Sequence, residues 1–239
     1  MIPLRDSVPL RTWPVVTWLL IGMNVWAFLN ELLLGPELQT FVETWGFVPA
    51  RYFALSELYP ENWVARYVPI FTSMFLHGGW LHLIGNMVYL WIFGDNVEDR
   101  LGHLRYLVFY LVAGVGAALV HAHLAPDSTI PTVGASGAIS GVLGAYAVLF
   151  PHSRVYTLVP FVFVFFGVIE IPAGVYLGLW FAMQVLNGAV GLAVPVEVSG
   201  GVAWWAHIGG FVIGMTVASL LRVMRPRERR RWRPEYAPW

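Results

Sequence analysis

The chain has 239 residues, of which 58% are hydrophobic and only 12% are charged, and its mean hydropathy is +0.65. Soluble domains carry about 25% charged residues, so this composition excludes an ordinary water-soluble globule and predicts a protein that crosses a membrane several times. The net charge of zero provides no basic field for nucleic acid, and the absence of cysteine excludes disulfides, thiol catalysis and Cys-ligated metal.

Six apolar segments have about the length that crosses the hydrocarbon core, which is about 20 residues for a helix. In chain order they are 13–34, 80–97, 103–124, 135–150, 172–192 and 203–223. We therefore expect one domain over residues 1–239, an all-α polytopic membrane protein built as a bundle of six transmembrane helices. Residues 225–239 form a basic tail.

The segment 155–170 is also apolar, but Pro160, Gly167 and the terminal Glu170 interrupt it. A charge at the centre of a bilayer costs about 2.5–3.5 kcal/mol. We therefore expect a short hairpin at the membrane interface, with a seventh span as the alternative. The largest loop, 35–77, is rich in aromatic residues and is expected at the outer interface.

Positive charges set the expected orientation, because they concentrate in cytoplasmic loops. All of them are Arg, and with the N-terminus inside only Arg51 and Arg66 lie outside. An even number of spans then places both termini in the cytoplasm. The Arg-rich tail can bind anionic lipid or nucleic acid, but we expect a stop-transfer anchor and no nucleic-acid partner.

Polar residues recur at the outer ends of the three spans that run inward, although such groups are costly in lipid and are by default functional. The second span carries His82 and Asn86, the fourth carries Ser136, and the sixth carries His207. Because these spans share a direction, the four side chains are expected at one depth, just below the outer surface.

Small residues are expected to bring the fourth and sixth spans into close contact, because they let helix backbones approach in lipid. Such a crossing places the Ser136 hydroxyl within hydrogen-bond reach of the His207 ring. The residues on the facing sides are Ser136, Gly137, Ser140, Gly141 and Gly144 on the fourth span and His207, Gly210 and Gly214 on the sixth.

A serine hydroxyl is a weak nucleophile until an adjacent imidazole base activates it, so Ser136 and His207 form the predicted catalytic pair. His82 and Asn86 lie four residues apart on one helical face. There they can stabilise an oxyanion together with backbone N–H groups at Ser136, and one such donor is worth about 2.7–4 kcal/mol. The constellation predicts acyl transfer to water, and therefore a hydrolase.

Each of these residues also has a structural interpretation: Ser136 as a packing residue, His207 as a cap, and His82 with Asn86 as an interhelical pair. A metal site at His77, His82 and His207 is disfavoured, because no HExxH and no carboxylate accompany them. We therefore expect no metal and no cofactor.

A third residue to orient His207 can be sought in the outer loops, where Asp127 and Glu197 lie. No spacing favours either of them, so the sequence predicts a dyad. We expect the fifth span to be a lateral gate, with Trp180 and Phe181 at a lipid-facing seam and the glycine-rich loop 191–201 as a lid.

These motifs together resemble the rhomboid family of intramembrane serine proteases in its six-helix form. The resemblance implies that Ser136 is the nucleophile and His207 the general base, with His82, Asn86 and the Ser136 backbone N–H as oxyanion donors. It implies that substrates are transmembrane proteins cut near the outer face and that no cofactor is used. The matching segments are the run from Phe75 to His82, Gly85-Asn86, the ExxxG from Glu98 to Gly102, the GxSG from Gly134 to Gly137, and the AHIGG from Ala206 to Gly210 with Gly214.

Two positions depart from the pattern of some relatives. Val68-Pro69 stands where they carry Trp-Arg, and Ser140 stands where they carry a Tyr or Phe against the catalytic histidine. The hydroxyl of Ser140 is therefore a candidate partner for the ring or for a water.

Two other functions are alternatives for such a chain. A non-catalytic rhomboid-like protein that binds and escorts transmembrane clients is the alternative, but such relatives typically lose the Ser or the His. A transporter would need a polar site at the middle of the membrane. The expected partners are transmembrane substrates and the lipid bilayer, with the oligomeric state left open. Arg without Lys, and no visible targeting presequence, lead us to expect the plasma membrane of a prokaryote.

Overall fold

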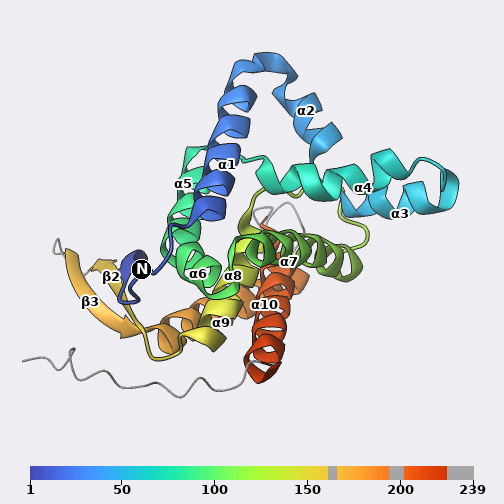
Figure 1. Cartoon of the computed structure of the whole chain (residues 1–239). Coiled ribbons are helices and arrows are strands. Elements are labelled where there is room, and N and C mark those ends of the chain that lie inside the picture. The colour runs from blue at the N-terminus through green and yellow to red at the C-terminus, as the bar shows by residue number, and fades with distance from the viewer. Residues whose placement is uncertain (161–165, 194–201, 225–239) are drawn as a thin grey trace, which may run out of the picture.

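The computed structural model describes residues 1–160, 166–193 and 202–224, so the tail 225–239 lies outside the described residues (Figure 1). All six expected spans are helical. Among the described residues, four helices are long and apolar enough to cross a membrane, and α8 is a shorter apolar helix. The six-span count and the cytoplasmic termini stay predictions. The helices are α1 (Val15–Leu33), α5 (Trp80–Tyr89), α7 (His103–Leu124), α8 (Ser136–Leu149), α9 (Ala173–Ala193) and α10 (Trp204–Met224).

The second expected span is not one regular helix. After α5 the chain forms a π-helical turn, η3 (Leu90–Gly94), and continues as α6 (Asp95–Leu101). A methyl group built at Gly94 would lie 2.7 Å from the Tyr106 hydroxyl, so the absence of a side chain there lets α7 pack closely against the turn. Gly102 then reverses the chain with a φ of +83°, a conformation that favours glycine.

A three-stranded antiparallel sheet makes the all-α expectation wrong in part, although the protein is mostly helical (Figure 1). The strands β2 (Arg154–Pro160) and β3 (Phe166–Pro172) pair as the expected hairpin, which excludes a seventh span here. β-Branched and aromatic residues favour this extended pairing. The strand β1 (Ile2–Asp6) adds to the other edge of β2, with Asp6 opposite Val155.

The side chain of Asp6 fastens this sheet to the helices. Its Oδ2 atom accepts hydrogen bonds from Asn96 Nδ2 of α6 at 2.9 Å and from the Tyr146 hydroxyl of α8. Burial raises the pKa of Asp6 above its ordinary value.

The long loop between the first two expected spans contains three short helices, α2 (Leu38–Trp45), α3 (Pro49–Leu58) and α4 (Trp63–Thr72), with the 3-10 turns η1 (Gly35–Glu37) and η2 (Ser73–Phe75). Pro49 opens α3, where its fixed φ suits the first helical position. Asn62 caps α4 by accepting from Ala65 N at 3.2 Å. The exposed Trp45 and Trp63 fit the expected outer interface.

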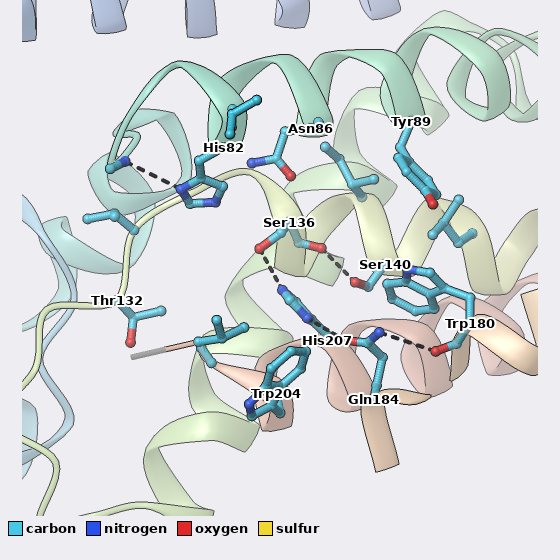
Figure 2. A pocket seen from close by; sticks show the side chains of 18 of the residues that line it. His82, Asn86, Tyr89, Thr132, Ser136, Ser140, Trp180, Gln184, Trp204 and His207 are labelled. Atoms are coloured by element: carbon cyan, nitrogen blue, oxygen red, sulfur yellow. Dashed lines mark hydrogen bonds between the residues drawn. The ribbon is translucent and has the colours of Figure 1, made fainter. Parts of the chain in front are cut away.

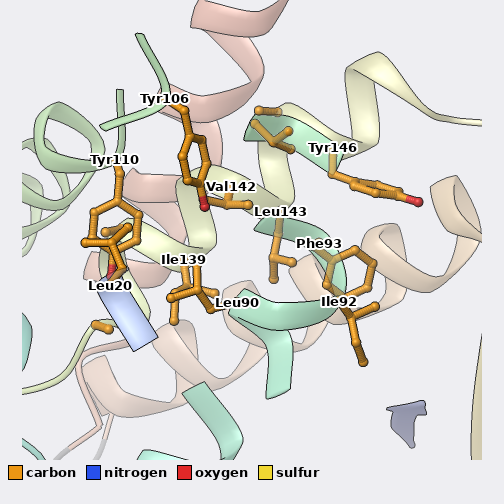
Figure 3. Close-up of a cluster of buried hydrophobic side chains, with 14 of the residues drawn as sticks. Leu20, Leu90, Ile92, Phe93, Tyr106, Tyr110, Ile139, Val142, Leu143 and Tyr146 are labelled. Atoms are coloured by element: carbon orange, nitrogen blue, oxygen red, sulfur yellow. The ribbon is translucent and has the colours of Figure 1, made fainter. Parts of the chain in front are cut away.

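The core lies where η3, α7 and α8 meet (Figure 3). Its largest side chains, among them Phe93, Tyr106, Tyr110 and Tyr146, are completely buried. The Phe93 and Tyr146 rings meet edge to face with centroids 5.0 Å apart. In lipid such close packing, rather than a hydrophobic driving force, holds helices together.

Glycines bring α8 and α10 into main-chain contact. A methyl group at Gly210 would overlap the carbonyl oxygen of Gly137, and one at Gly214 would overlap that of Gly141. This contact confirms the close crossing expected from the small residues. The relative position of the two helices is therefore set by backbone atoms.

A buried carboxylate joins α1 to α6. Glu98 is fully buried and accepts from Val16 N at 2.9 Å, Thr17 N at 2.7 Å, Thr17 Oγ1 at 2.7 Å and His103 Nδ1 at 2.5 Å. The two backbone donors belong to the first turn of α1, where N–H groups have no acceptor within the helix. Glu98 therefore caps α1.

Candidate active site

The nucleophile and base predicted from the sequence are in contact. Ser136 is the first residue of α8 and His207 lies in the first turn of α10, and Ser136 Oγ is 2.8 Å from His207 Nε2 (Figure 2). Both line a cavity of about 530 Å³ together with His82 and Asn86 of α5. All four expected residues thus meet at one cavity.

His82 presents a ring N–H to this cavity. The backbone N–H of Gly78 donates to His82 Nδ1 at 3.3 Å, so Nδ1 holds the lone pair and Nε2 of the neutral ring carries the hydrogen (Figure 2). Asn86 adds a second donor: its Nδ2 is buried and has no hydrogen-bond partner within the described part of the chain. A buried donor without a partner is costly, and both residues line the cavity.

Gly134 keeps these two donors open. A methyl group built there would lie 2.6 Å from His82 Nε2 and 3.5 Å from Asn86 Nδ2. Its φ of +119° is also one that residues with a side chain rarely adopt. Both the backbone and the space therefore require glycine at the first position of the GxSG motif.

The second ring nitrogen of His207 has a partner that the sequence reasoning missed. His207 Nδ1 lies 2.9 Å from Gln184 Oε1, on α9. Of the two residues considered for this place, Asp127 is exposed after α7 and Glu197 lies outside the described residues. The signal was present, because Gln184 is a strongly polar residue within an apolar span.

Ser140 does not hold the histidine ring. Its hydroxyl donates to the carbonyl oxygen of Ser136 at 2.6 Å, as a bond within α8. Two tryptophans flank the ring instead: the centroids of Trp180 and Trp204 each lie 6.1 Å from that of His207 (Figure 2). Aromatic rings thus lie beside His207 although residue 140 is a serine.

The expected gate residues face α10. Phe181 stacks on Phe211 at 4.7 Å between centroids, and Trp180 lies 5.9 Å from the same ring. α9 also contacts α5 through a 2.8 Å hydrogen bond between the hydroxyls of Tyr176 and Tyr89. The gate stays a prediction, and most of the expected lid lies outside the described residues.

Among the residues that the structure describes, no group of three His, Asp or Glu side chains could hold a metal ion. Both ring nitrogens of His207 are engaged, one by Ser136 and one by Gln184. The rings of His77 and His82 meet edge to face at 5.1 Å between centroids. Burial, with His82 as a neighbour, lowers the pKa of His77 to about 4, so this ring is neutral at physiological pH.

Comparison with known proteins identifies the family model described as "Rhomboid domain", which matches residues 64–223. The chain is similar to "Rhomboid protein 1, mitochondrial" of Saccharomyces cerevisiae, with 30% identity over 204 residues that cover 84% of this chain and 51% of the relative. It is similar to "Rhomboid protease GlpG" of Salmonella choleraesuis, with 26% identity over 90% of this chain and 66% of the relative. "RHOMBOID-like protein 6, mitochondrial" of Arabidopsis thaliana is 30% identical over 66% of this chain and 44% of the relative. The chain thus spans about half the length of the first of these relatives.

The expected location is wrong on the same comparison. The prokaryotic plasma membrane was inferred from Arg usage and the absence of a visible presequence, whereas several similar proteins are eukaryotic and carry mitochondrial names. Arg usage and the absence of a visible presequence therefore do not identify the membrane.

Proposed function

The chain belongs to the rhomboid family, and from this premise we propose that it is an intramembrane serine endopeptidase. It hydrolyses peptide bonds in or near the transmembrane segments of other membrane proteins. The observation that carries the proposal is the 2.8 Å contact of Ser136 Oγ with His207 Nε2, beside a buried amide donor that has no partner in the described chain.

In the first half of the reaction, Ser136 Oγ attacks the carbonyl carbon of the scissile bond while His207 Nε2 accepts the hydroxyl proton. The carbonyl oxygen becomes an oxyanion, which accepts hydrogen bonds from Asn86 Nδ2, His82 Nε2 and the Ser136 backbone N–H. When the C–N bond breaks, His207 returns the proton to the leaving amine. A serine ester of the substrate remains.

In the second half, water replaces the amine. His207 Nε2 removes a proton from water as its oxygen attacks the ester carbon, and the same donors hold the second oxyanion. Breaking the C–Oγ bond returns the proton to Ser136 and releases a carboxylic acid. The cycle uses no cofactor.

The substrate must expose a carbonyl to reach Ser136. A transmembrane helix has its carbonyls in internal hydrogen bonds, so the segment cut must unwind locally. Glycine or proline near the cut facilitates unwinding, because these two residues stabilise a helix least. The lipid bilayer and transmembrane proteins are therefore the proposed partners.

Labelling with a fluorophosphonate tests the proposal on the full chain in detergent micelles or liposomes. We expect labelling of the unchanged chain, none of Ser136→Ala, and a labelling rate at least about 10⁴-fold lower in His207→Ala. Ser140→Ala is the matched control, because it removes a neighbouring hydroxyl that bonds only the backbone of α8. If the unchanged folded chain takes no label yet still binds transmembrane segments, the escort alternative replaces the enzyme.

A further inference from the structure

We propose that Gln184 is a positioning residue that fixes the tautomer and the orientation of the His207 ring. The working unit is then Ser136, His207 and Gln184, not a dyad. The inference rests on the proposed function, since it assigns Gln184 a part in preparing the general base.

The directions of the two hydrogen bonds of His207 determine which of its ring nitrogens carries the hydrogen. A glutamine carbonyl oxygen can only accept, so the 2.9 Å contact of Gln184 Oε1 requires a hydrogen on His207 Nδ1. A neutral imidazole has one N–H, and His207 Nε2 therefore presents its lone pair to the Ser136 hydroxyl 2.8 Å away. This is the tautomer that a general base for Ser136 needs.

The orientation of the glutamine amide is itself fixed. Its Nε2 donates to the carbonyl oxygen of Trp180, one helical turn earlier, at 3.2 Å (Figure 2). That oxygen cannot donate, so the amide nitrogen must face it and Oε1 must face the ring. Reversing the amide would set two acceptors against each other at Trp180.

Burial strengthens the hydrogen bond between Gln184 Oε1 and His207 Nδ1. Gln184 is 6% exposed, so water competes little for either end of its amide. As a neutral acceptor it also avoids the cost of burying a carboxylate, which is several kcal/mol for an ion. The structure thus places at His207 Nδ1 a group that orients the ring without adding a charge within the membrane.

The contact also ties the base to a third helix. Ser136 and His207 come from α8 and α10, whereas Gln184 and the flanking Trp180 come from α9. The ring is therefore ready for catalysis only while α9 lies against α10.

The test measures fluorophosphonate labelling as a function of pH for the full chain in liposomes. Gln184→Leu keeps the approximate size but removes the acceptor, so we expect the limiting labelling rate to fall about 10–100-fold, with little change in probe affinity. Gln184→Glu keeps the acceptor and adds a charge that favours the imidazolium. The acidic limb of its pH profile should move upward by about one pH unit or more, with labelling retained above it.

Several outcomes decide the inference. It is overturned if Gln184→Leu labels at the unchanged rate, or if Gln184→Glu keeps the pH profile of the unchanged chain. Gln39→Leu, an exposed glutamine of α2, is the control and should alter neither. A purely structural Gln184 would lower the folded fraction, measured by thermal unfolding, without moving the pH profile of the folded fraction.

A spectroscopic measurement separates this inference from the proposed function. In ¹⁵N-histidine NMR, the His207 signals, identified by their loss in His207→Ala, should show the Nδ1–H tautomer in the unchanged chain and a mixed population in Gln184→Leu. This arm needs no catalysis. A chain that takes no label but shows the Nδ1–H tautomer refutes the enzyme alone, and an Nε2–H tautomer refutes the role of Gln184.

Discussion

Two buried polar residues, one on α5 and one on α6, differ in how many hydrogen bonds they form. Glu98 of α6 is fully buried, and its two oxygens accept four hydrogen bonds. Asn86 of α5 is 8% exposed, and its Nδ2 bonds nothing in the described chain although it borders the cavity. Burial of a polar residue in a membrane protein therefore does not by itself indicate a functional site. An unused donor beside a cavity does.

Asp6, which joins the sheet to the helices, resembles Glu98 in its role. Like Glu98, it accepts from two other elements, here α6 and α8, and holds the sheet in place. The end of the molecule near Glu98 and Asp6 thus uses its buried polar groups to join elements. At the end near Ser136, buried Gln184 also joins two helices, but Asn86 Nδ2 has no partner in the described chain.

The largest expected effect tests Glu98 as structure. In Glu98→Ala the first turn of α1 loses its cap and His103 loses its partner, so we expect the unfolding free energy to fall by about 3–5 kcal/mol. Thermal or denaturant unfolding in micelles measures this. Asp99→Ala, which removes an exposed carboxylate bonded to Thr12, should cost less than about 1 kcal/mol. Labelling per folded molecule should be unchanged, and a lowered rate would make Glu98 part of the site.

Asn86→Ala is expected to act on the rate. Loss of one oxyanion donor should raise the barrier by about 2.7–4 kcal/mol, which is a rate decrease of about 10²–10³-fold. Stability should stay constant or rise, because a buried donor without a partner is removed. Asn30→Ala, which removes an exposed amide of α1, is the matched control. If Asn86→Ala unfolds more easily and labels at the unchanged rate, Asn86 has a structural role like that of Glu98.

The smallest effect concerns Asp6 and pH. Because burial raises its pKa, the folded chain binds this proton more tightly than the unfolded chain does. The contribution of Asp6 to stability is therefore full at acidic pH and is lost as pH rises through the raised pKa. The side chain of Asn carries no charge at any pH. In Asp6→Asn the unfolding free energy should therefore exceed that of the unchanged chain increasingly toward neutral pH, by about 1 kcal/mol or less. If the unfolding free energies of Asp6→Asn and of the unchanged chain depended on pH equally, the pKa of Asp6 would not differ between the folded and unfolded states.

The sequence predicted the six apolar helical segments and the contact of Ser136 with His207, but not the short helices α2, α3 and α4 of the long loop. Hydropathy located all six segments, and the shared direction of three spans located Ser136, His207, His82 and Asn86. The pairing of β1 with β2 was not predicted, because strand pairing joins segments far apart in the chain and the five residues of β1 are too few for a periodic pattern. Gln184 escaped for a related reason: its partner is set by how α9 packs on α10, which no motif encodes.

The Gly137–Gly210 and Gly141–Gly214 contacts have a consequence for bilayers of different thickness. A span answers hydrophobic mismatch mainly by tilting, and two helices in main-chain contact have no intervening side chains that can rearrange as one slides past the other. α8 and α10 should therefore tilt as one body. The distance from Ser136 to His207 will then stay constant from thin to thick membranes, while the depth of the reacting bond changes with the lipid.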